Sequence, residues 1–370
     1  MEDTNMEDSI MSDSDSGSDS GSISPQSYPQ YMPQIPYTDP ATRLQTLDLW
    51  LPRPLSESDP ATTVFILYIH GGAWRDPTQD AACILPTLAH LSPSSTYSTT
   101  PHRASHPALS HIAGIASLDY RLSPYANHAT DPSSPDDSSR NAKWPDHVHD
   151  VRRAVRFLAK FYGLGRRHGW IGVGHSCGAT LLAQLVSGLG SDNTINGNDD
   201  SNTSTGAEEE EEEVVVGSTV DQGPTALILI AGIYSLPRLL ENHTPPACPE
   251  HISHIYREFV EGAFGPNLGH AGEDLYTLVS PCSGVYTPEI CPGLKSIVLA
   301  WSLQDELIEG QQREVMLARL KACGWGERGQ GYERVVEAKD LTDGHDQVWQ
   351  DGRQIATLIG EAVGQLFGSA

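Results

Sequence analysis

The strongest constraint on this chain is a series of short apolar runs that alternate with segments of helical periodicity. The apolar runs are Val64–Ile69, Ile115–Tyr120, Trp170–Gly174, Ala226–Ile230 and Ile297–Trp301. Apolar residues recur at helical spacing in Asp146–Tyr162, Ala179–Val186, Ile252–Phe264, Gln311–Ala322 and Asp346–Phe367. Strands that are apolar throughout are typically buried on both faces. The alternation therefore predicts an α/β fold, with a mostly parallel sheet and helices on both faces.

Two weaker patterns extend the predicted sheet. Tyr332–Glu337 alternates polar and apolar residues, as a partly exposed strand does. Arg43–Leu51 is a candidate for an early antiparallel edge strand. The 38% of residues that are hydrophobic suffice for one sizeable core, so we expect a single domain.

Polar segments of low complexity divide the chain. Residues 1–38 are rich in Ser, Asp, Gly, Pro and Gln, and we expect a disordered acidic tail there because apolar side chains are too few to offset the ordering entropy. The folded domain is expected at residues 39–370. Polar insertions are expected near 92–107, 127–143 and 191–222, and the last contains six consecutive glutamates.

The acidic excess argues against one class of partner. The chain has 48 acidic and 23 basic residues, a net charge of −25. Seventeen of the acidic residues lie in residues 1–30 and 191–221, which contain no Lys or Arg. Binding to phosphates needs a clustered basic surface, so we expect no nucleic-acid partner.

The sequence also carries expectations about location. Its first residues lack the basic and apolar regions of a secretory signal, and no apolar run approaches the length of a membrane span. The six cysteines show neither CxxC nor zinc-site spacing, which favours free thiols in a reducing compartment. We therefore expect a cytoplasmic protein without a membrane partner.

The first chemical motif is GHSCG at residues 174–178, which has the pattern G-x-S-x-G. It follows a strand-like run and precedes a good helix former, the context of a nucleophile elbow. A turn this sharp leaves no room for side chains at the two glycine positions. The motif thus predicts Ser176 as a nucleophile whose hydroxyl lies above the strand ends. An ordinary strand-to-helix turn is the alternative for this motif alone.

A second motif, His70-Gly71-Gly72-Ala73-Trp74, comes directly after the run Val64–Ile69. Consecutive glycines allow a backbone with exposed N–H groups, which suits an oxyanion hole. We expect Gly71 or Gly72 to donate together with Cys177 N–H, each donor stabilising the transition state by about 3 kcal/mol. A glycine-rich turn with no catalytic part is the alternative, which the presence of both motifs disfavours.

A serine nucleophile needs a general base and a group that orients it. In α/β-hydrolases an acid and then a histidine follow the serine along the chain. His345 lies between the last strand candidate and the final helix, and it is the predicted base. Asp305 follows the strand run Ile297–Trp301 and is the predicted acid, with Glu306 as its neighbouring rival.

Another cluster of polar residues has the composition of a metal site. Its members are Asp146, His147, His149 and Asp150. Residues two apart on a helix point to different faces, so we expect no metal site there. The nearby segment Asp119–Pro124 closes a strand, and we expect it to brace the site through an ion pair.

Together, HGG, DYRLSP, GHSCGA and a late Asp and His resemble the lipase/esterase branch of the α/β-hydrolases that is related to hormone-sensitive lipase. The form HGGAW is similar to that of the kynurenine formamidase (arylformamidase) family, fungal type. The resemblance covers about residues 40–368 and implies an HGGxW motif at His70–Trp74. It further implies a triad of Ser176, Asp305 and His345 in a cytosolic homodimer without a metal or organic cofactor.

The reaction that this resemblance implies is hydrolysis of N-formyl-L-kynurenine to L-kynurenine and formate. A broad carboxylesterase could use the same residues, and a non-catalytic binding protein on a hydrolase fold is a third hypothesis. Trp74 is open to two roles, stacking on the aryl ring of the substrate or filling the core below the loop. The sequence does not decide which residues bind the amino-acid end of the substrate, for which Arg75 and Tyr125 are two candidates.

Overall fold

The structure is a computed structural model that describes residues 27–92, 104–191, 223–268 and 274–368. Most of the tail expected at 1–38 lies outside these residues. The same holds for most of the insertion expected near 92–107 and nearly all of that at 191–222. The insertion expected at 127–143 is described and packs closely on the domain. Its Arg140 is fully buried and donates from Nη1 to Asp131 at 2.9 Å.

The described residues form a nine-stranded sheet in the order β1-β2-β4-β3-β5-β6-β7-β9-β8. The strands are β1 (Gln30–Pro36), β2 (Thr46–Leu51), β3 (Val64–Ile69), β4 (Ile112–Leu118), β5 (Gly169–His175), β6 (Ala226–Ile230), β7 (Ser296–Ser302), β8 (Gly326–Glu327) and β9 (Val335–Leu341). β2 pairs antiparallel with both β1 and β4, and the strands from β4 to β8 pair in parallel. The predicted mostly parallel sheet is confirmed.

The first strand corrects two expectations. Gln30–Pro36 was expected in the disordered tail, yet it pairs with β2, and the Asp48 carboxylate accepts from Tyr31 Oη and from Gln34 N. β2 is antiparallel as expected, but it lies inside the sheet because β1 covers its outer edge. Composition missed β1 because its stability comes from pairing with a distant strand rather than from its own apolar residues.

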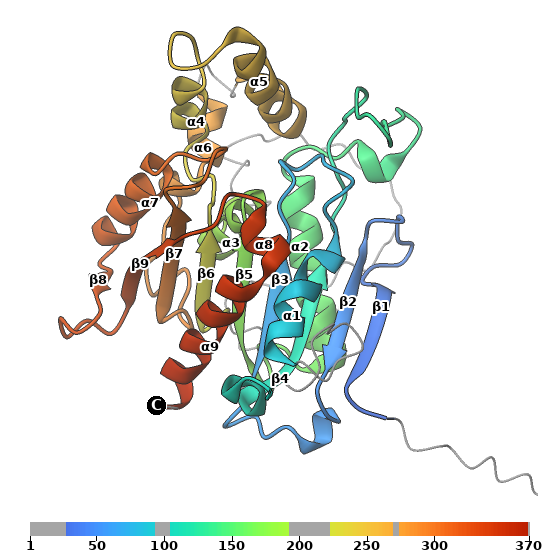
Figure 1. Ribbon diagram of the computed structural model, residues 1–370, viewed down its shortest axis with the longest axis vertical. Coiled ribbons are helices and arrows are strands. Elements are labelled where there is room, and N and C mark those ends of the chain that lie inside the picture. Colours follow the sequence, from blue (N-terminus) through green and yellow to red (C-terminus); the bar gives the residue numbers. More distant parts are fainter. Residues whose placement is uncertain (1–26, 93–103, 192–222, 269–273, 369–370) are drawn as a thin grey trace, which may run out of the picture.

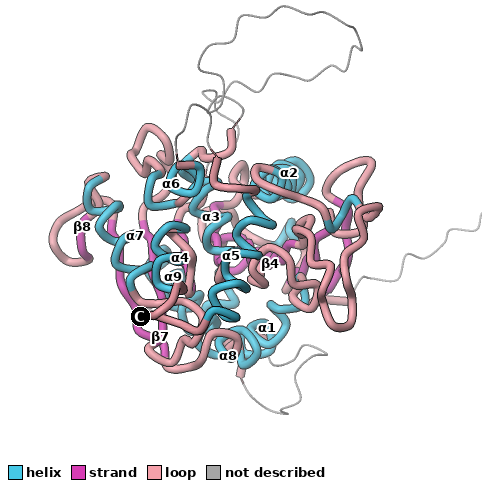
Figure 2. The backbone as a smooth tube through the Cα atoms, turned by 90° about the horizontal axis from the view of Figure 1, so that it is seen from above, coloured by secondary structure: helices cyan, strands magenta, loops and turns pink. Residues whose placement is uncertain are grey.

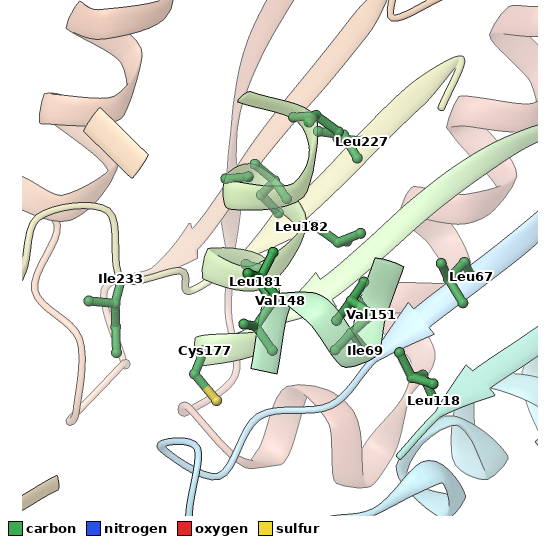
Figure 3. Packing of buried hydrophobic residues seen from close by; sticks show 14 of the residues in the cluster. Leu67, Ile69, Leu118, Val148, Val151, Cys177, Leu181, Leu182, Leu227 and Ile233 are labelled. Carbon is green, nitrogen blue, oxygen red and sulfur yellow. The ribbon is translucent and has the colours of Figure 1, made fainter. Parts of the chain in front are cut away.

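Helices cover both faces of the sheet (Figure 1). On one face lie α2 (Asp146–Tyr162), α3 (Cys177–Ser187) and α7 (Gln311–Ala322); on the other lie α1 (Leu85–Leu91), α8 (Gln347–Asp351) and α9 (Arg353–Phe367). In the first core, Val148 and Val151 of α2 and Leu181 of α3 pack near Leu67 and Ile69 of β3 (Figure 3). The apolar periodicity of α2 thus faces the sheet, as its sequence predicts.

The last predicted helix is broken in two. The segment Asp346–Phe367 was expected as one helix, but Gly352, with φ +74°, separates α8 from α9. A Cβ at Gly352 would lie 2.3 Å from Thr87 N of α1, so the backbones approach too closely for a side chain. Helical periodicity continues across such a break, which is why the sequence pattern did not reveal it.

Three further helices gather at one end of the molecule. These are α4 (Leu236–Asn242), α5 (Glu250–Phe264) and α6 (Leu275–Val279), at the top of Figure 1. Seen from above, α5 lies over the middle of the molecule (Figure 2). None of the helices in the described part of the chain combines the length and apolar character that crossing a bilayer requires.

Candidate active site

Ser176 occupies a sharp bend between β5 and α3. Its φ of 53° and ψ of −125° are rare for a residue with a side chain, and its N–H donates to Ile230 O at 2.8 Å. A Cβ at Gly174 would lie 2.6 Å from the Ala179 backbone, and one at Gly178 would lie 2.2 Å from Ile69 O. Both glycines are therefore required by close backbone contacts, as the motif predicts.

Asp305 and His345 meet although 40 residues separate them in the chain. His345 Nδ1 lies 2.9 Å from Asp305 Oδ2 and 3.0 Å from Oδ1, and both side chains are buried. The backbone N–H groups of Leu307 and Ile308 donate to Asp305 Oδ1 at 3.0 and 2.8 Å. The carboxylate is thus held rigidly, and it can keep the proton of His345 on Nδ1.

Glu306, the rival acid, contacts a different part of the same loop. Its Oε2 accepts from the backbone N–H of His345 at 3.1 Å, not from the imidazole. A Cβ at Gly344 would lie 3.1 Å from this oxygen, so a side chain there would crowd the contact. Glu306 therefore positions the backbone of the histidine loop, and Asp305 is the acid in contact with the ring.

Ser176 and His345 line one cavity of about 220 Å³. Gly72 and Ala73 line it as well, and α5 contributes Tyr256 and Phe259 from above. The loops that follow β3, β5, β7 and β9 supply the glycines, Ser176, Asp305 and His345 respectively. These parallel strands end on the same edge of the sheet, where ligands of α/β folds usually bind.

The diglycine loop lies against Ser176. A Cβ at Gly71 would come within 3.0 Å of Ser176 Cβ, and Gly72 has φ +94°. Ala73 and Trp74 also have positive φ, so the backbone turns back over three residues. The Cys177 thiol accepts from Trp74 N at 3.2 Å and thereby ties this loop to the residue after the serine.

His70 and Trp74 support the loop from below. Burial lowers the pKa of His70 to about 4, and its neutral ring stacks on Tyr120 with centroids 4.6 Å apart. Trp74 is fully buried and packs edge-on against Phe264 of α5, with centroids 5.0 Å apart. Of the two roles open for Trp74, this position favours core filling over stacking on a substrate.

His175 is a member of the site that the sequence analysis did not assign. It is fully buried, and its Nε2 donates to His345 O at 3.0 Å. Burial is the main cause that lowers the pKa of His175 well below its usual value, so the ring is neutral. The position of His175 next to Ser176 in the motif was the one sequence feature that could have indicated a role in the site. Its contact with the backbone of His345 depends on the tertiary fold.

The cluster considered as a metal site has structural contacts instead. Asp150 binds Arg121 Nε at 2.8 Å, His147 Nε2 lies 3.0 Å from Ser123 Oγ, and His149 Nε2 lies 2.8 Å from Gly190 O. The Arg121–Asp150 pair is the brace expected from the segment Asp119–Pro124. Throughout the described ranges, no group of three or more His, Cys, Asp or Glu residues is placed to hold a metal ion.

No protein-family model matches the chain. A kynurenine formamidase-like hydrolase of Fusarium equiseti is 31% identical over 336 residues, which are 90% of this chain and 94% of that protein. A kynurenine formamidase of Aspergillus versicolor is 30% identical over 332 residues, 85% of this chain and 94% of that protein. The chain belongs to the kynurenine formamidase family.

Solved structures support the fold of this family member. Esterase B of Lactobacillus rhamnosis superposes with a TM-score of 0.54 and 15% identity, covering 91% of this chain and 87% of that protein. An arylesterase superposes with a TM-score of 0.52 and 15% identity, covering 91% and 84%. The fold is that of an α/β-hydrolase, as the two glycine motifs predict.

Proposed function

We propose that this chain hydrolyses N-formyl-L-kynurenine to L-kynurenine and formate, a step of tryptophan degradation through the kynurenine pathway. The observation that carries the proposal is the Asp305–His345 pair, whose histidine shares a cavity with Ser176 on its strained bend. Membership of the kynurenine formamidase family supplies the substrate class.

In the first half of the proposed reaction, Ser176 Oγ attacks the formyl carbon while His345 Nε2 takes the hydroxyl proton. Asp305 holds the ring by its Nδ1 and stabilises the imidazolium that forms. The carbonyl oxygen becomes negative, and the N–H groups of Gly71 or Gly72 and Cys177 would stabilise it. The closeness of Gly71 to Ser176 supports this assignment.

In the second half, the imidazolium of His345 protonates the arylamine nitrogen as the C–N bond breaks. The amine leaves as neutral kynurenine because its anion would be a poor leaving group. Water, deprotonated by the same histidine, then attacks the formyl-serine, and formate leaves as Ser176 regains its proton. The reaction has no redox step. One water molecule is consumed for each formamide bond that is cleaved.

The proposal includes a cytoplasmic homodimer that acts on a small molecule without nucleic-acid, membrane or cofactor partners. Support for a reducing compartment comes from the cysteines, since all six are free thiols. The homodimer rests on the family resemblance, and its test is the molar mass of the full chain in solution.

A broad carboxylesterase is the competing activity, since esterases share this fold. The test compares kcat/KM for N-formyl-L-kynurenine and for p-nitrophenyl acetate. We expect a preference for the formamide, and a strong preference for the ester would refute the proposal. A fluorophosphonate probe should label the wild type and not Ser176→Ala, whereas an unlabelled wild type would favour a non-catalytic binding protein.

A further inference from the structure

The cavity that holds Ser176 also contains a buried cation that the proposed mechanism does not use. Arg75 directly follows the HGGAW motif, and its side chain is only 6% exposed. Its Nη1 lies 3.2 Å from Glu258 Oε1 of α5, and its guanidinium makes no hydrogen bond to other described residues. A guanidinium has five N–H donors, so most of them are available to a ligand in the cavity that it lines.

Aromatic rings lie next to this guanidinium. Its Cζ lies 4.0 Å from the centroid of the Tyr125 ring and 5.9 Å from that of Phe259, and both rings line the same cavity. Contact with the Tyr125 ring restrains the position of the group before any ligand binds. A planar fork restrained in this way suits a carboxylate, which can accept two parallel hydrogen bonds.

The residue that follows Arg75 in the chain, Asp76, is acidic. Asp76 lines the cavity too, and its Oδ1 accepts from Thr78 N at 2.9 Å and from Thr78 Oγ1 at 2.7 Å. His128 Nε2 lies 3.7 Å from the same oxygen, whereas Oδ2 makes no hydrogen bond to the described residues. One wall of the cavity therefore offers a fixed positive group and a carboxylate oxygen from consecutive residues.

We infer that Arg75 and Asp76 recognise the amino-acid end of the substrate, Arg75 binding its α-carboxylate and Asp76 its α-ammonium group. This inference rests on the proposed function and deepens it. Ser176 takes the formyl group, and the apolar side chains of Ile255, Phe259 and Ile308 surround the space left for the aryl ring. The cavity thus selects zwitterionic aryl formamides over neutral esters of similar size.

A purely structural role for Arg75 predicts different kinetics. The Arg75–Glu258 pair also joins the diglycine loop to α5, so losing it could disturb the site as a whole. That disturbance would slow every substrate alike and would change kcat. Loss of carboxylate recognition instead raises KM, and only for substrates that carry the carboxylate.

The experiment combines four variants with four substrates. The substrates are N-formyl-L-kynurenine, its carboxamide, its deamino analogue 4-(2-formamidophenyl)-4-oxobutanoate, and 2′-formamidoacetophenone, which lacks both charged groups. The variants are Arg75→Met, Arg75→Lys, Asp76→Asn and Arg257→Met. Arg257 is the matched control because it forms an Arg–Glu pair with Glu250 on α5 and does not line the cavity.

Removing one charged hydrogen-bonding partner should lower kcat/KM about 10- to 100-fold. For Arg75→Met we expect this loss with the two substrates that carry a carboxylate, mainly through a higher KM. With the carboxamide, kcat/KM should fall less than about threefold. Asp76→Asn should show the same loss with substrates that carry the ammonium group. Arg75→Lys, which keeps the charge but loses the fork, should be intermediate, and Arg257→Met should match the wild type.

Three results would overturn the inference. One is an equal loss on all four substrates in Arg75→Met, which indicates a structural role. Another is an equal kcat/KM of the wild type for 2′-formamidoacetophenone and N-formyl-L-kynurenine. This result would agree with the proposed formamidase activity but would show that the enzyme does not recognise the charged groups. A wild type that cleaves p-nitrophenyl acetate but no formamide refutes the proposed function and this inference with it.

Discussion

Replacing Asp305 by Asn tests the proposed triad without changing the shape of the site. The asparagine oxygen can still accept from the N–H groups of Leu307 and Ile308, which lie 3.0 and 2.8 Å from Asp305 Oδ1. Its amide nitrogen, however, would face His345 Nδ1, which lies 2.9 Å from Oδ2. An amide that donates there places the imidazole proton on Nε2, so that nitrogen can no longer accept the proton of Ser176.

This wrong tautomer should lower kcat for N-formyl-L-kynurenine about 10⁴-fold, as Asp-to-Asn replacement does in serine proteases, or about 5.5 kcal/mol in activation free energy. The melting temperature should change little because the two backbone donors keep their acceptor. Asp305→Ala should also destabilise the fold by about 1–3 kcal/mol, since those donors would be left unpaired.

Glu306→Gln is the matched control for this experiment. The glutamine oxygen can still accept from His345 N, the contact that Glu306 makes at 3.1 Å, so kcat should fall less than about tenfold. The assay is steady-state hydrolysis of N-formyl-L-kynurenine followed by the absorbance of kynurenine. Retention of more than a tenth of wild-type kcat in Asp305→Asn, or an equal loss in Glu306→Gln, would refute the assignment of the acid.

Three other perturbations test the surroundings of the site. Ser176→Gly relieves the strain that a side chain causes at φ 53°. In urea titrations its free energy of unfolding should be about 1 kcal/mol higher than that of Ser176→Ala. Equal free energies of unfolding would mean that the bend is unstrained. Cys177→Ala removes the acceptor of Trp74 N and should lower kcat about tenfold at constant KM, with Cys177→Ser restoring much of the loss; a change in KM alone would contradict this role. Burial lowers the pKa of His147 from 6.5 to about 4 in the folded protein. As pH falls, His147 is therefore protonated in the unfolded chain before it is protonated in the folded protein. The free energy of unfolding consequently falls between pH 6.5 and pH 4. In urea titrations, the free energy of unfolding of His147→Gln should fall about 2 kcal/mol less between pH 7 and pH 5 than that of the wild type. An equal fall in both proteins would exclude protonation of His147 as a cause.

Much of the site could be predicted because its motifs impose local geometry. The glycines around Ser176 are needed wherever a strand turns sharply into a helix, and chain order alone pointed to His345 as the base. The choice between Asp305 and Glu306 rested on position along the chain, and both carboxylates approach residue 345. Only their contacts separate them, since one carboxylate meets the ring and the other meets the backbone.

The sequence by itself determined the buried strands, the helix faces and the bend at Ser176, because these follow from periodicity and from contacts between residues close in the chain. The tertiary structure alone decided that Gln30–Pro36 is a strand, that Gly352 divides the last helix and that His175 supports residue 345. It also decided that Arg75 and Asp76 line the cavity of Ser176. Each of these depends on a partner distant in sequence, and the packing that selects that partner leaves no periodic pattern in the chain.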